Sequence, residues 1–173
     1  EAMDYTKVNA SYCTVADEVF AGVIPDFQNP AKTRRLFSAA ITPEGPVNYL
    51  ETVLQDVKKL YVIKGEPGTG KTTFVGVIAR QAEIMGLDTE VYHSSLVPQK
   101  VDIVVIPHLE TAIANLAEPI SFDPGCLEKL ETCRELDFSA FLNQRVLKNY
   151  AVEIASCRDR FEYTFNRGCS KTT

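Results

Sequence analysis

The stretch from Leu60 to Thr72 constrains the fold of this chain more than any other part of it. Leu60-Tyr61-Val62-Ile63-Lys64 is a short β-prone run that leads directly into Gly65-Glu66-Pro67-Gly68-Thr69-Gly70-Lys71-Thr72. That segment matches G-x-x-x-x-G-K-[ST] at every fixed position. Apolar residues at helical spacing follow over Lys71–Met85, with Gly86 as the expected C-cap. A strand, a glycine-rich loop and an amphipathic helix in this order predict a phosphate-binding loop in an α/β protein.

Each residue type in this loop has a physical role in holding phosphate. Glycines adopt backbone angles closed to other residues and remove the Cβ atoms that would block a phosphate group. The loop amides and the N-terminus of the following helix then form an anion site. We expect Lys71 to reach the β and γ phosphates as a catalytic residue, and the Thr72 hydroxyl to bind Mg²⁺. The expected nucleotide-binding residues are Gly65, Glu66, Pro67, Gly68, Thr69, Gly70, Lys71, Thr72 and Thr73.

The remaining pattern predicts alternating helices and strands. Strands are expected at 36–41, 89–93, 101–106 and 111–116, helices at 15–23 and 47–58, and a loop at 117–125. This order implies a mostly parallel sheet flanked by helices. From Leu127 to Asn166 the apolar spacing predicts a helical C-terminal region, broken around 136–139, that packs on the sheet or on a partner. We expect an N-terminal extension over 1–35 and one nucleotide-binding domain over 36–173.

A loop of this kind normally works with an acidic residue at the end of a neighbouring strand. The strand at 101–106 ends in Pro107-His108-Leu109-Glu110, which makes Glu110 the candidate for a metal-linked or catalytic role; the alternative is a solvated loop carboxylate. Asp102 lies at the other end of that strand and would point away from the nucleotide in a parallel sheet. Asp123 is a second acidic candidate, and its alternative is an Asx turn before Pro124.

Other polar residues have weaker claims. His93, followed by Ser94 and Ser95, is expected at the carboxyl end of a strand, where it could contact substrate or γ-phosphate or merely cap a loop. Glu66 could orient water, although a residue there usually faces solvent. A lid or finger arginine could come from the C-terminal region, whose candidates are Arg134, Arg145, Arg158, Arg160 and Arg167.

Composition excludes several classes of protein. A net charge of −5 argues against a broadly basic nucleic-acid-binding surface. The five cysteines include no C-x-x-C pair, so zinc ribbons and thioredoxin-like motifs lack support. No apolar run approaches the roughly 18 residues of a membrane span, and no signal-peptide core is present. We therefore expect a soluble cytoplasmic protein, and a start at Glu1 leaves open that the chain is a piece of a longer one.

Two segments, Arg35–Gly45 and Leu60–Thr72, make the chain resemble a poorly characterised family of bacterial ATPases with two tandem P-loop domains, most closely the second domain. The likeness extends to Glu90–His93, Val101–Pro107 and Ala117–Pro124, so it covers about residues 35–125. In the last segment Ile120 stands where the family usually has histidine, which puts that loop's role in doubt. The resemblance implies a P-loop NTPase fold that binds ATP at the loop. It also implies that a second P-loop domain, or another copy of the chain, could supply missing acidic or arginine residues.

Together these features predict a Mg²⁺-dependent ATPase whose cycle drives a conformational change in a partner. ATP is the default nucleotide because the guanine-reading motif Asn-Lys-x-Asp is absent. One alternative is a kinase that transfers the γ-phosphate to a nucleoside or other small molecule bound near His93. Another is a binding module that holds the nucleotide without hydrolysing it.

Overall fold

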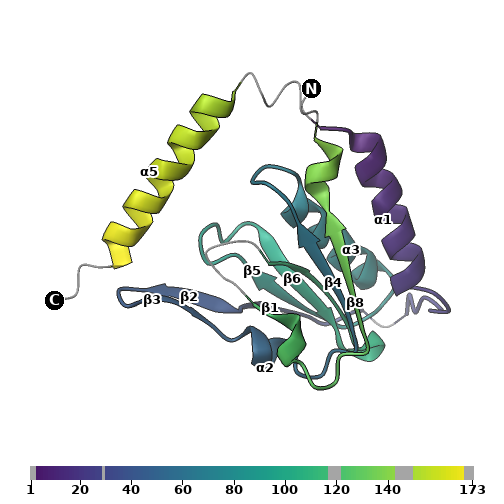
Figure 1. Cartoon of the computed structure of the whole chain (residues 1–173). Helices are drawn as coiled ribbons and strands as arrows, with labels where there is room; N and C mark the ends of the chain where they lie inside the picture. Colours follow the sequence, from purple (N-terminus) through teal and green to yellow (C-terminus); the bar gives the residue numbers. More distant parts are fainter. Residues whose placement is uncertain (1–2, 29, 117–121, 143–149, 170–173) are drawn as a thin grey trace.

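Strand β4 (Lys59–Lys64), which ends at the glycine-rich loop Gly65–Thr72, lies within a six-stranded sheet of order β1-β5-β6-β7-β4-β8. The computed structural model describes residues 3–28, 30–116, 122–142 and 150–169 (Figure 1). The other strands are β1 (Thr33–Phe37), β2 (Ala39–Thr42), β3 (Gly45–Asn48), β5 (Thr89–His93), β6 (Val101–Ile106), β7 (Thr111–Asn115) and β8 (Thr132–Asp137). The helices are α1 (Tyr5–Val19), α2 (Leu50–Leu54), α3 (Lys71–Ile84) and α5 (Ala151–Cys169), with 3-10 turns η1 (Pro107–Leu109), η2 (Pro124–Cys126) and η3 (Phe138–Phe141). The predicted α/β class and mostly parallel sheet are confirmed.

Side chains of β4 alternate between the two faces of the sheet, and each face has its own core. Tyr61 and Ile63 pack with α1 and α3, whereas Leu60 and Val62 pack with α2. All four are buried, as expected for a central strand covered on both faces. Burying one aliphatic side chain fully stabilises the folded state by about 1.5–3 kcal/mol. Burial on both faces therefore fixes the end of β4, from which the loop begins.

The N-terminal segment belongs to this core. Helix α1 begins at the N-cap Asp4, whose carboxylate accepts a hydrogen bond from the Lys7 amide, and it buries Val15 and Val19 against the sheet. It is longer than the helix expected at 15–23. The expected boundary after residue 35 falls inside β1, which pairs in parallel with β5.

Strand β6 runs antiparallel to both β5 and β7, while β1, β5, β7, β4 and β8 point the same way. The assumption of a parallel strand at 101–106 is therefore wrong. The reason is the length of the connections: 94–100 links β5 to β6 and 107–110 links β6 to β7, and a parallel crossover needs about a dozen residues or more. As a result, the start of β6 lies at the loop edge of the sheet and its end lies at the opposite edge.

The C-terminal region differs from the continuous helix expected from Leu127. Residues Thr132–Asp137 form β8, an edge strand parallel to β4, and Phe138–Phe141 form η3 beneath the glycine-rich loop. Helix α5 stands apart from the sheet, above the β2–β3 hairpin (Figure 1). Part of the expected loop at 117–125, with Ile120, and the segment with Arg145 lie outside the described residues.

The strand expected at 36–41 is interrupted at Ser38. Its first half is β1, and its second half, β2, forms a separate antiparallel hairpin with β3. The helix expected at 47–58 is shorter and spans Leu50–Leu54. In the described parts of the chain, no helix has the length and apolar character needed to cross a membrane.

Candidate functional site

The glycine-rich loop depends on three glycines in a backbone region that other residues rarely adopt. Gly65, Gly68 and Gly70 have φ angles of 140°, 85° and 80°. A Cβ atom on Gly65 would lie 3.1 Å from both Phe138 Cβ and the Ser139 amide nitrogen, so this glycine also permits close packing on η3. The loop is thus a tight turn seated on η3, and it ends where α3 begins.

Lys71 folds back into this loop. Its Nζ atom donates hydrogen bonds to the carbonyl oxygens of Gly65 and Glu66, each at 2.7 Å, and lies 3.4 Å from Thr69 Oγ1. The side chain is buried, and burial lowers the pKa of its ammonium group, while the nearby charge of Asp102 opposes this shift. The loop therefore encloses a cation that is held by main-chain oxygens.

Thr72 and Thr73 lie on the first turn of α3, immediately after Lys71. Thr72 is half-buried and Thr73 is exposed. The hydroxyl of Thr72 is an oxygen donor of the kind that Mg²⁺ prefers. Glu66, Pro67 and Gly68 are exposed at the tip of the loop.

Asp102 and Asn115 form a polar pair at the same edge of the sheet. Asn115 Nδ2 donates to Asp102 Oδ1 at 2.9 Å, because the register of β6 and β7 aligns Ile103 with Ala114. The alternation of each strand places both side chains on the α3 face, with Val104 and Ile113. Asn115 Oδ1 is buried and has no hydrogen-bond partner among the described residues. The pair therefore brings a carboxylate near Lys71 and leaves a buried oxygen able to accept a hydrogen bond.

The expectation that Asp102 points away from the nucleotide is wrong, because β6 runs antiparallel to both of its neighbours. The signal that would have identified Asp102 was the short connection on each side of β6. Glu110, the acidic residue expected near the nucleotide, follows β6 at the opposite edge of the sheet. There its carboxylate pairs with Lys58 Nζ at 2.7 Å, and its carbonyl accepts from the amides of Lys58 and Lys59 at the start of β4. The structure does not bring Glu110 to the loop, and the strand direction on which its assignment rested is wrong.

His93 ends β5 at the loop edge. Its Nε2 lies 3.5 Å from Arg35 Nη1, its ring packs against Phe37, and its buried Nδ1 has no partner within the described part of the chain. The two serines that follow have hydrogen-bond partners in the protein: the Ser94 amide donates to the Lys100 carbonyl within the same loop, and the Ser95 hydroxyl donates to the carbonyl of Ala39, the first residue of β2.

Asp123 forms an Asx turn, which is the structural alternative to a role in binding a ligand. Its carboxylate accepts from the Gly125 amide at 2.9 Å, directly before η2. This hydrogen bond accounts for the residue without a ligand.

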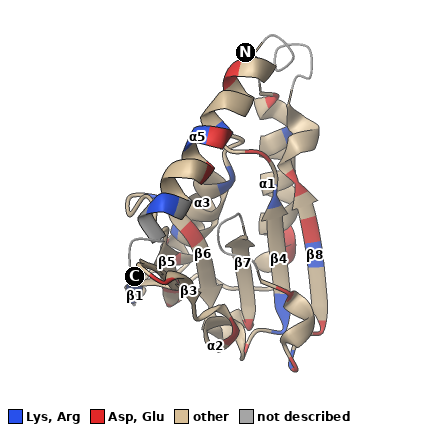
Figure 2. Cartoon of the chain, turned by 60° about the vertical axis from the view of Figure 1, so that its left-hand side comes forward, with Lys and Arg blue, Asp and Glu red and all other residues tan. Residues whose placement is uncertain are grey.

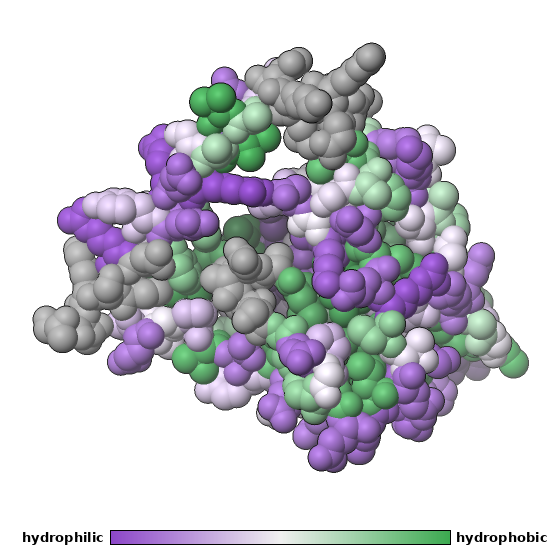
Figure 3. Space-filling view, in the orientation of Figure 1, coloured by the Kyte–Doolittle hydropathy of each residue, from purple (hydrophilic) through white to green (hydrophobic). Residues whose placement is uncertain are grey.

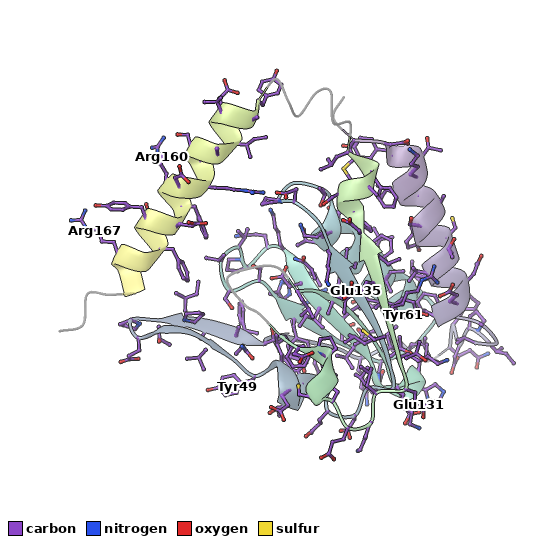
Figure 4. All side chains as sticks on the ribbon, in the orientation of Figure 1. Tyr49, Tyr61, Glu131, Glu135, Arg160 and Arg167 are labelled. Atoms are coloured by element: carbon purple, nitrogen blue, oxygen red, sulfur yellow. The ribbon has the colours of Figure 1, made fainter. Side chains whose placement is uncertain are left out.

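The candidate arginines are placed differently from one another. Arg158, on α5, forms an ion pair with Glu66 in the glycine-rich loop. Arg134, on β8, pairs with Glu18 of α1, whose carboxyl pKa is lowered by that contact. Arg160 and Arg167 point away from the sheet (Figure 4). Acidic and basic residues are interspersed along α5 (Figure 2), so the helix has no uniformly basic face.

Among the described residues, no group of three or more His, Cys, Asp or Glu side chains is placed to hold a metal ion. No family model, curated protein or solved structure matches this chain significantly. The features of this edge of the sheet that bear on function are the loop, Lys71 and the Asp102–Asn115 pair.

Proposed function

We propose that the chain binds a nucleoside triphosphate, by default ATP, with Mg²⁺ at Gly65–Thr72 and hydrolyses it. One observation carries this proposal: Lys71 Nζ lies inside a loop made by three positive-φ glycines, at the start of α3. Such a loop suits an anion because its amides, a helix N-terminus and a fixed ammonium group all favour negative charge. Phosphate oxygens would replace the Gly65 and Glu66 carbonyls as partners of Lys71.

The residues around the loop fit a magnesium ion bound with the phosphates. The Thr72 hydroxyl would be its protein ligand, and Asp102 would hold the ion through water. This assignment is supported by the location of Asp102 near Lys71 and by the neighbouring Asn115 Oδ1, which has no hydrogen-bond partner in the described part of the chain. Magnesium commonly keeps several waters and takes one or two oxygen ligands from the protein. Bound there, Mg²⁺ would neutralise the charge that develops on the phosphates.

In hydrolysis, a water oxygen attacks the γ-phosphorus, the bond to the β–γ bridging oxygen breaks, and the water proton leaves to a base or a phosphate oxygen. Lys71 would neutralise charge on the leaving phosphate. Asp102 and Asn115 would accept hydrogen bonds from water near the γ-phosphate and fix its position. Positioning and electrostatic stabilisation supply most of the catalysis in this reaction class.

One observation favours a second candidate function, a small-molecule kinase. His93 lies at the loop edge of β5, and its buried Nδ1, which has no hydrogen-bond partner among the described residues, could contact an acceptor hydroxyl. The proposed coupling of hydrolysis to a partner, such as a second P-loop domain or another copy of the chain, remains a prediction.

Phosphate release from MgATP tests the proposal when the wild type is compared with Lys71→Ala, Asp102→Ala and Glu110→Ala. We expect Lys71→Ala to abolish turnover and Asp102→Ala to lower it by about 10²-fold or more. Glu110→Ala should match the wild type because its carboxylate pairs with Lys58 far from the loop.

Each other outcome selects a different function. Turnover that requires an added acceptor indicates the kinase, and tight nucleotide binding without product indicates the passive module. Loss of activity in Glu110→Ala with full activity in Asp102→Ala would overturn the assignment of Asp102.

A further inference from the structure

Helix α5 has little contact with the rest of the molecule. None of its described side chains is buried, and most are exposed. It stands off from the sheet on the side of the β2–β3 hairpin (Figure 1). In the described part of the chain, the ion pair that joins α5 to the sheet domain is Arg158–Glu66. Figure 3 shows a hollow between α5 and the domain, crossed by hydrophilic side chains. One arginine therefore connects this helix to the tip of the glycine-rich loop.

The face of α5 that carries Arg158 is largely apolar apart from Glu162, which lies four residues after Arg158. Ile154, Phe161 and Phe165 lie four residues before, three after and seven after Arg158, so they share its side of the helix. The rings of Phe161 and Phe165 are stacked, with centroids 5.8 Å apart. Ile154 and Phe161 are 39% and 49% exposed. An apolar stripe left this open favours a conformation in which the helix face is covered.

The contact that holds α5 in place is weak. The side chains of Arg158 and Glu66 are 52% and 48% exposed, and ion pairs this open to water contribute little to stability. A polyphosphate in the loop would present several negative oxygens close to Glu66, and arginine binds phosphate through two parallel hydrogen bonds. Bound nucleotide would therefore compete with Glu66 for Arg158.

We propose that α5 is a lid over the glycine-rich loop, and that Arg158 leaves Glu66 for the terminal phosphates when nucleotide binds. This inference rests on the proposed nucleotide-binding function. Closure carries the apolar face of α5 toward the loop and the hairpin, which covers Ile154 and Phe161. Arg160 serves as a matched control because it lies two residues further on and points away from the domain (Figure 4).

The chain offers an internal probe of lid closure. Cys157 is a free, exposed thiol on α5, three residues after Ile154 and four before Phe161, so it lies along the apolar stripe, and Cys13 is a free, exposed thiol on α1. The rate at which iodoacetamide alkylates each thiol is followed by peptide mass spectrometry, with and without MgATP. Nucleotide binding is measured in the same samples by equilibrium dialysis.

We expect MgATP to slow alkylation of Cys157 by about fivefold in the wild type and in Arg160→Ala, as for a lid closed about four-fifths of the time. In Arg158→Ala the protection should be lost, and Cys13 should react at one rate throughout. Equal protection of Cys157 in Arg158→Ala, or binding without protection in the wild type, overturns the lid while leaving the nucleotide site intact. Absence of binding overturns both proposals.

A second measurement separates a contact with the terminal phosphate from general attraction to the nucleotide. Arg158→Ala should lose about tenfold in affinity for MgATP while its affinity for MgADP changes by less than about twofold. Arg160→Ala should keep both affinities. An equal loss for the two nucleotides would contradict a contact with the terminal phosphate.

Discussion

Replacing Gly65 with alanine tests the geometry on which the proposed site depends. Gly65 has φ 140°, a backbone region that strains any residue with a side chain, at a cost of about 1–3 kcal/mol. The added Cβ would also lie 3.1 Å from Phe138 Cβ and from the Ser139 amide nitrogen, neither of which can rotate away. Forcing η3 outward adds about 1 kcal/mol or more. We expect Gly65→Ala to lower the free energy of unfolding by about 2–4 kcal/mol.

Two other glycines serve as matched controls. Gly68 has φ 85°, and a Cβ there would meet nothing within 4 Å, so Gly68→Ala should cost only the backbone strain of about 1–2 kcal/mol. Gly76 lies in α3 with open space around it, so Gly76→Ala should stabilise the protein by about 0.5–1 kcal/mol. Urea unfolding followed by circular dichroism gives the three values. Equal stability of Gly65→Ala and Gly68→Ala would refute the close packing of the loop on η3.

Two further predictions concern the elements that support the loop. Phe138 is fully buried between the rings of Phe74 and Phe141, so Phe138→Ala should lower the free energy of unfolding in urea by about 3–5 kcal/mol. Phe27 is 78% exposed, so Phe27→Ala should lower it by less than about 0.5 kcal/mol. Similar costs for the two variants would place Phe138 outside the core. Arg134 lowers the pKa of Glu18 from its usual 4.5, so the stability from this pair is present above pH 4.5 and is lost as the pH falls through the lowered pKa. Because both side chains are partly exposed, Arg134→Met should cost at most about 1 kcal/mol at pH 7 and nothing at strongly acidic pH, and a cost independent of pH would contradict the pairing.

The strand, loop and helix of the candidate site could be predicted from the sequence, because each depends on residues close together in the chain. A β-prone run, a loop rich in glycine and an amphipathic helix follow one another over 60–85, and each element depends on residues within it. The structure places β4, the loop and α3 accordingly. Lys71 and Thr72 begin α3 directly after the loop, and their expected roles toward phosphate and Mg²⁺ stay predictions.

Which acidic residue lies beside the loop depends on the direction of β6, and the loop motif carries no information about that direction. The connections 94–100 and 107–110 are too short for parallel crossovers, and this fact alone reverses β6. In an antiparallel β6, Asp102 lies at the edge of the sheet that carries the loop, and Glu110 lies at the opposite edge. This part of the site was therefore available from the sequence through connection length rather than through the position of an acidic residue after an apolar run.

Neither strand β8 nor the contact between α5 and the loop could be predicted from motifs or from connection lengths. Residues Thr132–Asp137 are mostly exposed and lack the apolar alternation of a strand, and they are extended because they pair with β4 at the edge of the sheet. The ion pair of Arg158 with Glu66 joins residues far apart in the chain, and no spacing rule connects them. Tertiary pairing decides both features.

Calorimetric titration of the protein with MgATP is the most direct test of the central claim that the glycine-rich loop binds a triphosphate through Lys71. Lys71→Ala removes the ammonium group inside the loop, and Lys129→Ala removes an exposed one that pairs with Asp56. We predict saturable binding by the wild type and Lys129→Ala, and affinity weakened at least about tenfold, or 1.4 kcal/mol, in Lys71→Ala. Absence of binding by the folded wild type, or equal affinity in all three proteins, would contradict the claim.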